Sequence, residues 1–315
     1  MARSGPVSPF SQDVQDYLAL RRSLGHDLSD AGRLLPRFAG YLESIGAEFV
    51  STEAALAWSC QPDVPASSTV WPKRMTAARG FARYMAGVDA RTEVPPPGLV
   101  PSRQHWRPPF TYSNADVLAL MGQARLLPTS PFRALTFETL VGLLATTGLR
   151  VGEAIKLGRD DIDWAEGVLF VHRSKFGKSR QVPLQQTSVT ALALYAKERD
   201  KLKGRLPTPN FFVSLHGTPL IYAVVGQVFR ELCAGAGVGA SSSVRPRIHD
   251  LRHSFAVHCL AQWYSEGVDV QARLPLLSTY LGHREPRYTY WYLSAAPELL
   301  AHAARRLETA SAVTR

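Results

Sequence analysis

A proline-rich segment in the first third of the chain is the feature that most constrains its fold. Residues 91–110 (RTEVPPPGLVPSRQHWRPPF) contain six of the chain's 22 prolines. Proline fixes φ and lacks a backbone N–H, so this composition favours an extended, semi-rigid connection over a helix or a strand. We therefore predict a linker at residues 91–110, between an N-terminal domain of residues 1–90 and a second domain of residues 111–315. A chain of 315 residues is long enough for two cores of ordinary size.

The sequence before this linker predicts a small helical bundle. Apolar residues recur at helical spacing over residues 11–24 and 29–45. Polar caps precede two further helical segments, one ending near Trp58 and one over residues 69–86.

The sequence after the linker predicts a larger domain that is mainly helical. Residues 168–172 and 180–184 have strand patterns on either side of the polar loop SKFGKS, which predicts a β-hairpin. A further short strand is expected over residues 211–214. The predicted fold class is therefore α+β, mainly α with a small antiparallel sheet. We expect helices over residues 114–125, 133–147, 187–205, 222–235 and 248–263.

The net positive charge of the chain lies entirely after residue 100. The formal net charge is +10, yet residues 1–100 hold 10 basic and 10 acidic side chains, whereas residues 101–315 hold 26 and 16. A basic domain attracts polyanions, nucleic acid first. From charge alone, a surface that serves solubility is an equal alternative.

Composition argues against several other classes of protein. No apolar run approaches the roughly 20 residues that span a bilayer, and the N-terminus lacks the apolar core of a signal peptide. The cysteines, Cys60, Cys233 and Cys259, are far apart and form no C-x-x-C pair. We expect a reduced, cytoplasmic protein with no cofactor and no small-molecule substrate.

Residues 247–292 bring together three kinds of chemistry. His249 and Arg252 form an H-x-x-R pair, His283 follows Leu-Gly, and Tyr292 comes nine residues later. Positions i and i+3 share a helical face, so the histidine and the arginine point into one site. An arginine fork binds a phosphate in a bidentate way, and cations make a tyrosine hydroxyl, with its usual pKa of about 10, a better nucleophile. The cluster predicts attack of a tyrosine on a phosphodiester.

This order of motifs resembles the C-terminal signature of the tyrosine recombinase (phage integrase) family. The T-G-L-R-x-x-E-x-x-x-L pattern that contains Arg150 and Glu153 is similar to the first arginine box of that family. The hairpin resembles the one that carries the family's catalytic lysine. Counting back from Val182-Pro183-Leu184 places this lysine at Lys175, with Lys178 as a competitor.

The resemblance implies a metal- and ATP-independent reaction through a 3′-phosphotyrosyl intermediate and a free 5′-hydroxyl. Spacing from the histidine of L-G-H selects Tyr292 as the nucleophile over Tyr288 and Tyr290. Glu153 would orient an arginine. The other implied roles are phosphate binding for Arg150 and Arg252, proton handling of the tyrosine for His249, a hydrogen bond to phosphate for His283, and general acid for Lys175.

The resemblance also implies double-stranded DNA as the partner, clamped between the two domains. The protein would act as a homo-oligomer, a tetramer on DNA, alone or with sister recombinases. An apolar stripe in residues 295–310 would pack on its own domain or on a neighbouring protomer. Basic side chains predicted to contact the DNA backbone, or else only water, are Arg74, Arg79, Arg103, Arg107, Lys178 and Arg180.

Four alternatives remain at the level of sequence. A type IB topoisomerase shares this chemistry but typically has a lysine in place of His249. An accessory DNA-binding protein would lack one of the catalytic residues, and an RNA-binding protein would need an aromatic-basic signature. His249 and His253 are spaced like metal ligands, but Arg252 would lie beside the ion. The segment between the second arginine and L-G-H departs from the family pattern. Residues 262–276 make this segment longer than is usual in the family, and we interpret the extra length as an insertion in a loop.

Overall fold

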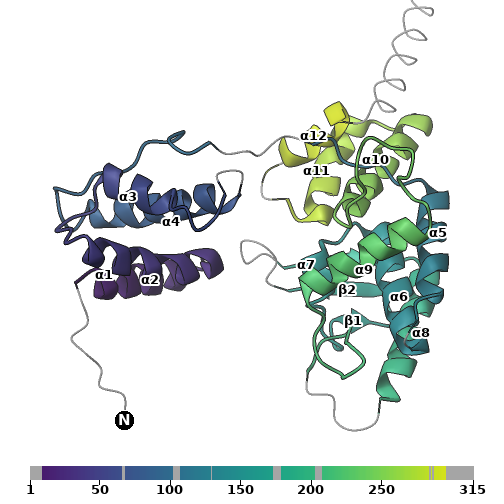
Figure 1. Ribbon diagram of the computed structural model, residues 1–315. Helices are drawn as coiled ribbons and strands as arrows, with labels where there is room; N and C mark the ends of the chain where they lie inside the picture. The colour runs from purple at the N-terminus through teal and green to yellow at the C-terminus, as the bar shows by residue number, and fades with distance from the viewer. Residues whose placement is uncertain are drawn as a thin grey trace, which may run out of the picture. The chain divides into compact units, whose positions relative to one another are not determined.

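The computed structural model forms two compact units, Met1–Trp106 and Arg107–Arg315, each described here by itself (Figure 1). The division between the units falls within the predicted linker. The structure describes residues 9–65, 68–101, 107–128, 130–172, 179–202, 208–283, 285 and 287–295. Most of the predicted C-terminal stripe, residues 296–310, lies outside the described residues.

The first unit contains the helices α1 (Pro9–Ser23), α2 (Ser29–Ser44), α3 (Thr52–Ser59) and α4 (Val70–Met85). Helix α1 packs against α2 and α4, and α3 packs against the same two helices. The side chains of Leu35, Phe38 and Phe81 are fully buried between them. Ser51 caps α3 by accepting a hydrogen bond from the Ala54 N–H at 3.1 Å.

The proline-rich segment begins by folding back on the first unit. Arg79, on α4, donates to the carbonyl oxygens of Pro95 at 2.8 Å and Pro96 at 2.9 Å. Val100 is also buried. The first half of the predicted linker is therefore held against α4 by the hydrogen bonds of Arg79.

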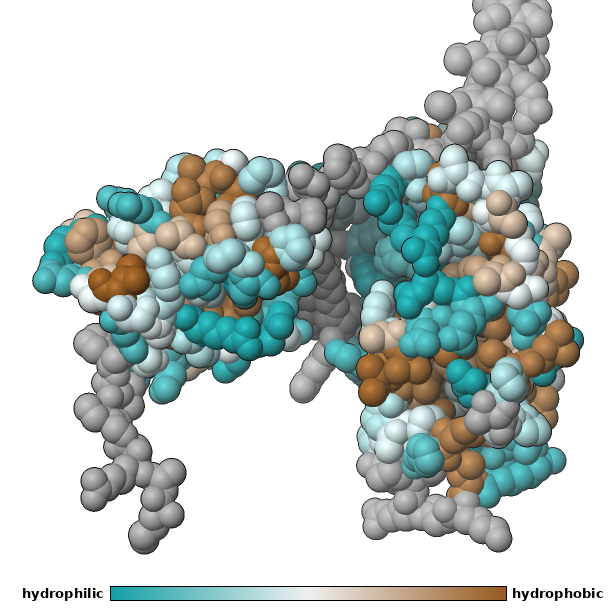
Figure 2. Space-filling view, viewed as in Figure 1, coloured by the Kyte–Doolittle hydropathy of each residue, from teal (hydrophilic) through white to brown (hydrophobic). Residues whose placement is uncertain are grey.

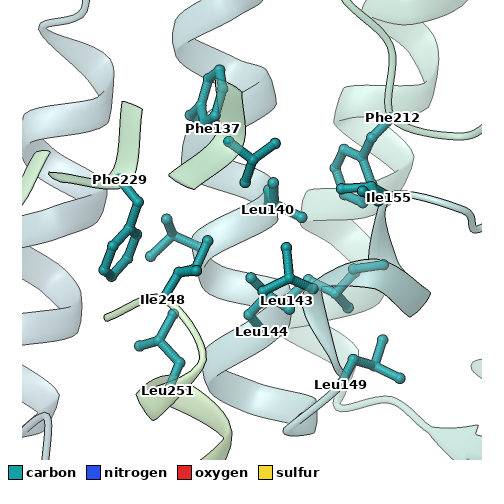
Figure 3. Packing of buried hydrophobic residues seen from close by; sticks show 14 of the residues in the cluster. Phe137, Leu140, Leu143, Leu144, Leu149, Ile155, Phe212, Phe229, Ile248 and Leu251 are labelled. Atoms are coloured by element: carbon teal, nitrogen blue, oxygen red, sulfur yellow. The ribbon is translucent and has the colours of Figure 1, made fainter. Parts of the chain in front are cut away.

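The second unit is built around α6 (Pro131–Thr147), whose apolar side chains enter the main core (Figure 3). Leu140, Leu143 and Leu144 lie on this helix and are almost fully buried. Gly148 ends the helix in the left-handed conformation, φ 60°, which a residue without Cβ adopts at little cost. Helices α5 (Asn114–Arg125), α7 (Val151–Ala154) and α8 (Gln186–Asp200) pack against α6, and α9 (Tyr222–Gly235) packs against α5.

A three-stranded antiparallel sheet completes this part of the unit. Its strands, in spatial order, are β1 (Ile162–Asp163), β2 (Val168–Val171) and β3 (Arg180–Pro183). The mainly helical fold class with a small antiparallel sheet is thus confirmed. The strand predicted over residues 211–214 is wrong. The chain there forms only the isolated β-bridge between Val213 and Pro219, and a tight turn over residues 214–218 connects the two sides of this bridge.

Three further helices enclose a second apolar cluster: α10 (Asp250–Ser265), α11 (Val270–Leu281) and α12 (Arg287–Ala295). Asp269 caps α11 by accepting from the N–H groups of Gln271 and Ala272. Residues 262–276, interpreted above as a loop insertion, are therefore mostly helical. No helix in the described ranges is long and apolar enough to cross a membrane.

Candidate active site

Arg150 stands at the start of α7, where Gly148 has just turned the chain away from α6. Its backbone is extended, and Glu153 binds it twice: Oε2 accepts from the Arg150 N–H at 3.0 Å and Oε1 from Nη1 at 2.7 Å. The side chain of Arg150 remains 24% exposed. The expected contact of Glu153 with an arginine is present, and Arg150 is both fixed and accessible.

Arg252 lies in the first turn of α10 and is buried. Its Nη1 donates to the Gly148 carbonyl at 2.8 Å and its Nη2 to the Leu281 carbonyl at 2.7 Å. Among the described residues, no carboxylate lies within ion-pair distance of it. Burial, and then the charge of Arg150, lower the pKa of Arg252 to about 10, although a phenolate charge on nearby Tyr292 acts the other way. The group is therefore a buried cation at neutral pH with only neutral partners.

The L-G-H turn binds the guanidinium groups of both Arg252 and Arg150 through its backbone carbonyls. Leu281 ends α11 and Gly282 follows with φ 67°. The Leu281 carbonyl accepts from Arg252, and the next carbonyl, that of Gly282, accepts from Arg150 Nη2 at 3.2 Å. Two adjacent peptide groups thus hold two guanidinium groups beside His283.

His283 and Tyr292 stack on each other, with ring centroids 5.9 Å apart and an interplanar angle of 24°. The Nδ1 atom of His283 hydrogen-bonds to Thr289 Oγ1 at 2.8 Å. Burial, then the nearby arginine charges, lower the pKa of His283 to about 4, so the ring is neutral at pH 7. Tyr292 is 7% exposed, whereas Tyr288 and Tyr290 are 49% and 45% exposed. Of the three tyrosines, only Tyr292 packs into the second apolar cluster.

His249 immediately precedes α10 and is exposed at the surface. The surrounding protein partly removes water from the imidazole of His249. This desolvation, and then the charge of Arg252, lower the pKa of His249 below its usual value. Its neighbour Asp250 is buried and instead pairs with Arg247, with Nη2 and Oδ1 2.9 Å apart. No cluster of three or more His, Cys, Asp or Glu side chains able to hold a metal ion occurs in the described parts of the chain.

His253, which the sequence suggested only as a metal ligand together with His249, is a buried neighbour of the site. Its ring lies 5.2 Å from the rings of both Trp291 and Tyr292. Neither of its nitrogens has a hydrogen-bond partner among the described residues. A sequence signal for this position is that His253 comes one residue after Arg252, on an adjoining face of the helix.

Two of the arginines predicted to contact DNA are buried and already paired with carboxylates in this structure. Arg74 is 5% exposed and donates from Nη1 to Asp63 Oδ1 at 2.8 Å. The side chain of Arg180 is 9% exposed and pairs with Glu153. Strand alternation carried a signal for the second case, because Arg180 shares a face of β3 with buried Val182.

The other side chains predicted to contact DNA differ in exposure and in whether the structure describes them. Arg107 is exposed, and hydrophilic residues cover much of the visible face of the second unit (Figure 2). Arg79 is engaged with proline carbonyls, as described above. Lys175, Lys178 and Arg103 lie outside the described residues.

A family model described as "Phage integrase family" matches residues 115–298. The chain belongs to the phage integrase family. It is 40% identical over 308 residues to y4rB of Sinorhizobium fredii, named as an integrase/recombinase, covering 96% of this chain and 98% of that one. It is 32% identical over 303 residues to tyrosine recombinase XerD of Mycobacterium tuberculosis, covering 89% and 91%.

Solved structures of this family share the fold. A structure of the Tn1549 transposon integrase with transposon right end DNA has a TM-score of 0.62 at 17% identity, covering 94% of this chain and 98% of that one. A structure of the XerH recombinase bound to difH DNA has a TM-score of 0.60 at 18% identity, covering 89% and 80%. The predicted family and activity are confirmed: this member is a tyrosine recombinase, an enzyme of site-specific DNA recombination.

Proposed function

We propose that Tyr292 is the nucleophile of this recombinase. Its hydroxyl oxygen would form a bond to the scissile phosphorus while the bond from phosphorus to the 5′-oxygen breaks. The products are a 3′-phosphotyrosyl link and a free 5′-hydroxyl, and the 5′-hydroxyl of a partner strand then reverses the step. The single observation that supports this most is the L-G-H turn, whose two carbonyls hold Arg252 and Arg150 while its histidine stacks on Tyr292.

Arg150 and Arg252 would bind the non-bridging oxygens of the phosphate. A buried arginine held only by carbonyl oxygens retains its full charge, and Arg252 is such a group. The five-coordinate transition state carries more negative charge on these oxygens than the ground state. Fixed cations therefore stabilise it preferentially, without having to reorient during the reaction.

Three residues would handle protons and the remaining oxygen contacts. His249, with its lowered pKa, is neutral at pH 7 and would accept the proton of Tyr292. For His283 to donate from Nε2 to a phosphate oxygen, its Nδ1 must accept from the hydroxyl of Thr289, which lies at hydrogen-bond distance. Lys175 would protonate the leaving 5′-oxygen.

The substrate would be duplex DNA from a mobile element, bound in the cytoplasm by a homo-oligomer, a tetramer on DNA, with or without sister recombinases. The DNA-bound integrase and XerH structures above support a DNA partner. The recombinase names of the relatives favour strand exchange over topoisomerase activity or a silent accessory role. Arg79, Arg103, Arg107 and Lys178 remain candidates for backbone contacts.

Covalent trapping tests the nucleophile. The protein is incubated without metal on nicked duplex from the ends of its own element, and adducts that survive denaturant are counted. Tyr292→Phe should retain DNA binding and form no adduct. Tyr290→Phe, two residues away and exposed, is the matched control and should form as much adduct as the wild type. An adduct in Tyr292→Phe would exclude this tyrosine as the nucleophile.

A further inference from the structure

We infer that Arg180 is a positioning residue, which acts through Glu153 on Arg150 and so fixes the phosphate-binding guanidinium. The inference rests on the proposed role of Arg150. Neither the motif pattern nor the family match assigns this task to Arg180, which the sequence had suggested as a DNA contact.

Arg180 binds the carboxylate of Glu153 in a bidentate way, through its two terminal nitrogens. Its Nη1 donates to Oε1 at 3.2 Å and its Nη2 to Oε2 at 2.9 Å. The same two oxygens accept from Arg150, so each carboxylate oxygen of Glu153 serves both arginines. With Arg180 in place, the carboxylate has one orientation, and that orientation is the one that holds Arg150.

The electrostatic environment makes this arrangement stiff. The side chains of Arg180 and Glu153 are only 9% and 7% exposed. Burial alone would raise the pKa of Glu153, but Arg180, followed by Arg150, more than offsets it and holds the pKa at about 2. Charge-assisted, bidentate pairs of this kind are geometrically specific. A change at Arg180 should therefore reach Arg150 even though the two guanidinium groups need not touch.

A third contact extends the link to the L-G-H turn. Arg180 Nε donates to the Tyr280 carbonyl at 2.7 Å, at the end of α11. A Cβ on Gly282 would lie 2.9 Å from Arg180 Nη1, so the glycine leaves room for this guanidinium as well as allowing φ 67°. The carbonyl of Gly282 in turn accepts from Arg150. Arg180 thus links β3, the second strand of the predicted lysine hairpin, to Glu153 and to the L-G-H turn, the two supports of Arg150.

The test compares cleavage of two DNA substrates under single-turnover conditions. One has an ordinary scissile phosphate, and the other a methylphosphonate, in which a methyl group replaces one non-bridging oxygen and its charge. If Arg180 acts through Arg150, Arg180→Gln should cleave the ordinary substrate about 10- to 100-fold more slowly, as expected for a misplaced catalytic group. Its defect on the methylphosphonate should be several-fold smaller, because less charge needs to be neutralised.

Two further variants separate positioning from loss of folding. Arg180→Lys keeps the charge but loses the fork, and should be intermediate in rate with unchanged DNA affinity. In a Glu153→Gln background, Arg180→Gln should cost little more, because the two residues act in series. The control Arg125→Gln removes another arginine–carboxylate pair of the same unit, that with Glu138, and should leave both rates unchanged.

Several outcomes would overturn the inference. Equal rate losses on both substrates would indicate a general structural role, and a loss of DNA affinity that accounts for the rate would indicate a backbone contact. Rescue by a 5′-bridging phosphorothiolate instead would mean that Arg180 acts through the leaving-group acid. Absence of any adduct with the wild-type protein on either substrate would contradict the proposed function itself, and is distinct from all three.

Discussion

Replacing His253 with leucine should change how the stability of the second unit depends on pH. The imidazole is 4% exposed, lies against Trp291 and Tyr292, and has no hydrogen-bond partner for either nitrogen among the described residues. Burial, opposed by the charge of Asp250, lowers the pKa of His253 to about 4, compared with about 6.5 for a free histidine. Folding therefore requires the neutral form of this side chain.

The direction of the effect follows from the difference in bound protons. Between pH 6.5 and pH 4 the unfolded chain holds a proton on His253 that the folded chain does not, so stability falls as the pH falls through this range. The slope approaches about 1 kcal/mol per pH unit, and the total is at most about 3 kcal/mol. Well above pH 6.5, His253 is unprotonated in both the folded and the unfolded chain, so the free energy of unfolding no longer changes with pH because of this residue.

His253→Leu removes the titratable group, so this residue no longer contributes to the difference in bound protons between the unfolded and the folded chain. The slope of unfolding free energy against pH, measured between pH 5 and 6, should become shallower by about 1 kcal/mol per unit. At pH 7 the variant should be at least as stable as the wild type, because two unsatisfied polar atoms, each costing about 1–3 kcal/mol, are replaced by an apolar group. Urea denaturation followed by tryptophan fluorescence measures both quantities, since Trp291 contacts the substituted side chain.

His258→Leu is the matched control, because it removes an exposed histidine from the same helix. An unchanged slope in His253→Leu would refute the reasoning about protonation. A loss of several kcal/mol at pH 7 would show that the imidazole nitrogens do have partners that stabilise the fold.

Three other variants test separate parts of the structure. Lys175→Ala should slow cleavage of ordinary DNA but recover on a 5′-bridging phosphorothiolate, whose sulfur leaves without a proton; no recovery would exclude Lys175 as the acid. Gly148→Ala should lower unfolding free energy by about 2 kcal/mol or more, since φ is 60° and the new Cβ would lie 2.5 Å from the Phe255 ring. Tyr112→Phe should cost about 1 kcal/mol in urea denaturation by removing the hydroxyl donor to the Arg247 carbonyl, and a neutral result would make that bond unimportant.

Local patterns in the sequence were enough to find most helices and the hairpin. Ser113 directly precedes the helix predicted over residues 114–125, and it forms a full capping box with Asp116. Gly148 directly follows the helix predicted over residues 133–147, and it has the left-handed conformation expected of a terminating glycine. These features depend on residues only a few positions apart, which is why they can be read from the chain directly.

What the sequence did not reveal are contacts between distant residues. Arg180 looked like one more basic residue near a hairpin, but its partners are Glu153, 27 positions earlier, and Tyr280, 100 positions later. Arg74 was likewise indistinguishable from a solvated arginine, although it packs over the Trp58 ring and pairs with Asp63. Whether an arginine is a surface charge or a structural one depends on tertiary neighbours, which helical periodicity does not specify.

The support of Arg252 by carbonyl oxygens has a consequence for handling the protein. Around the site, Arg150 and Arg180 pair with the carboxylate of Glu153, whereas Arg252 pairs with no carboxylate among the described residues. Three positive charges thus face one negative charge, and the DNA-free enzyme has an excess of fixed positive charge there. Small multivalent oxyanions have the shape and charge of the scissile group. Phosphate or sulfate buffers should therefore inhibit strand cleavage more than chloride at equal ionic strength, and buffers free of oxyanions are the appropriate choice for assays of this enzyme.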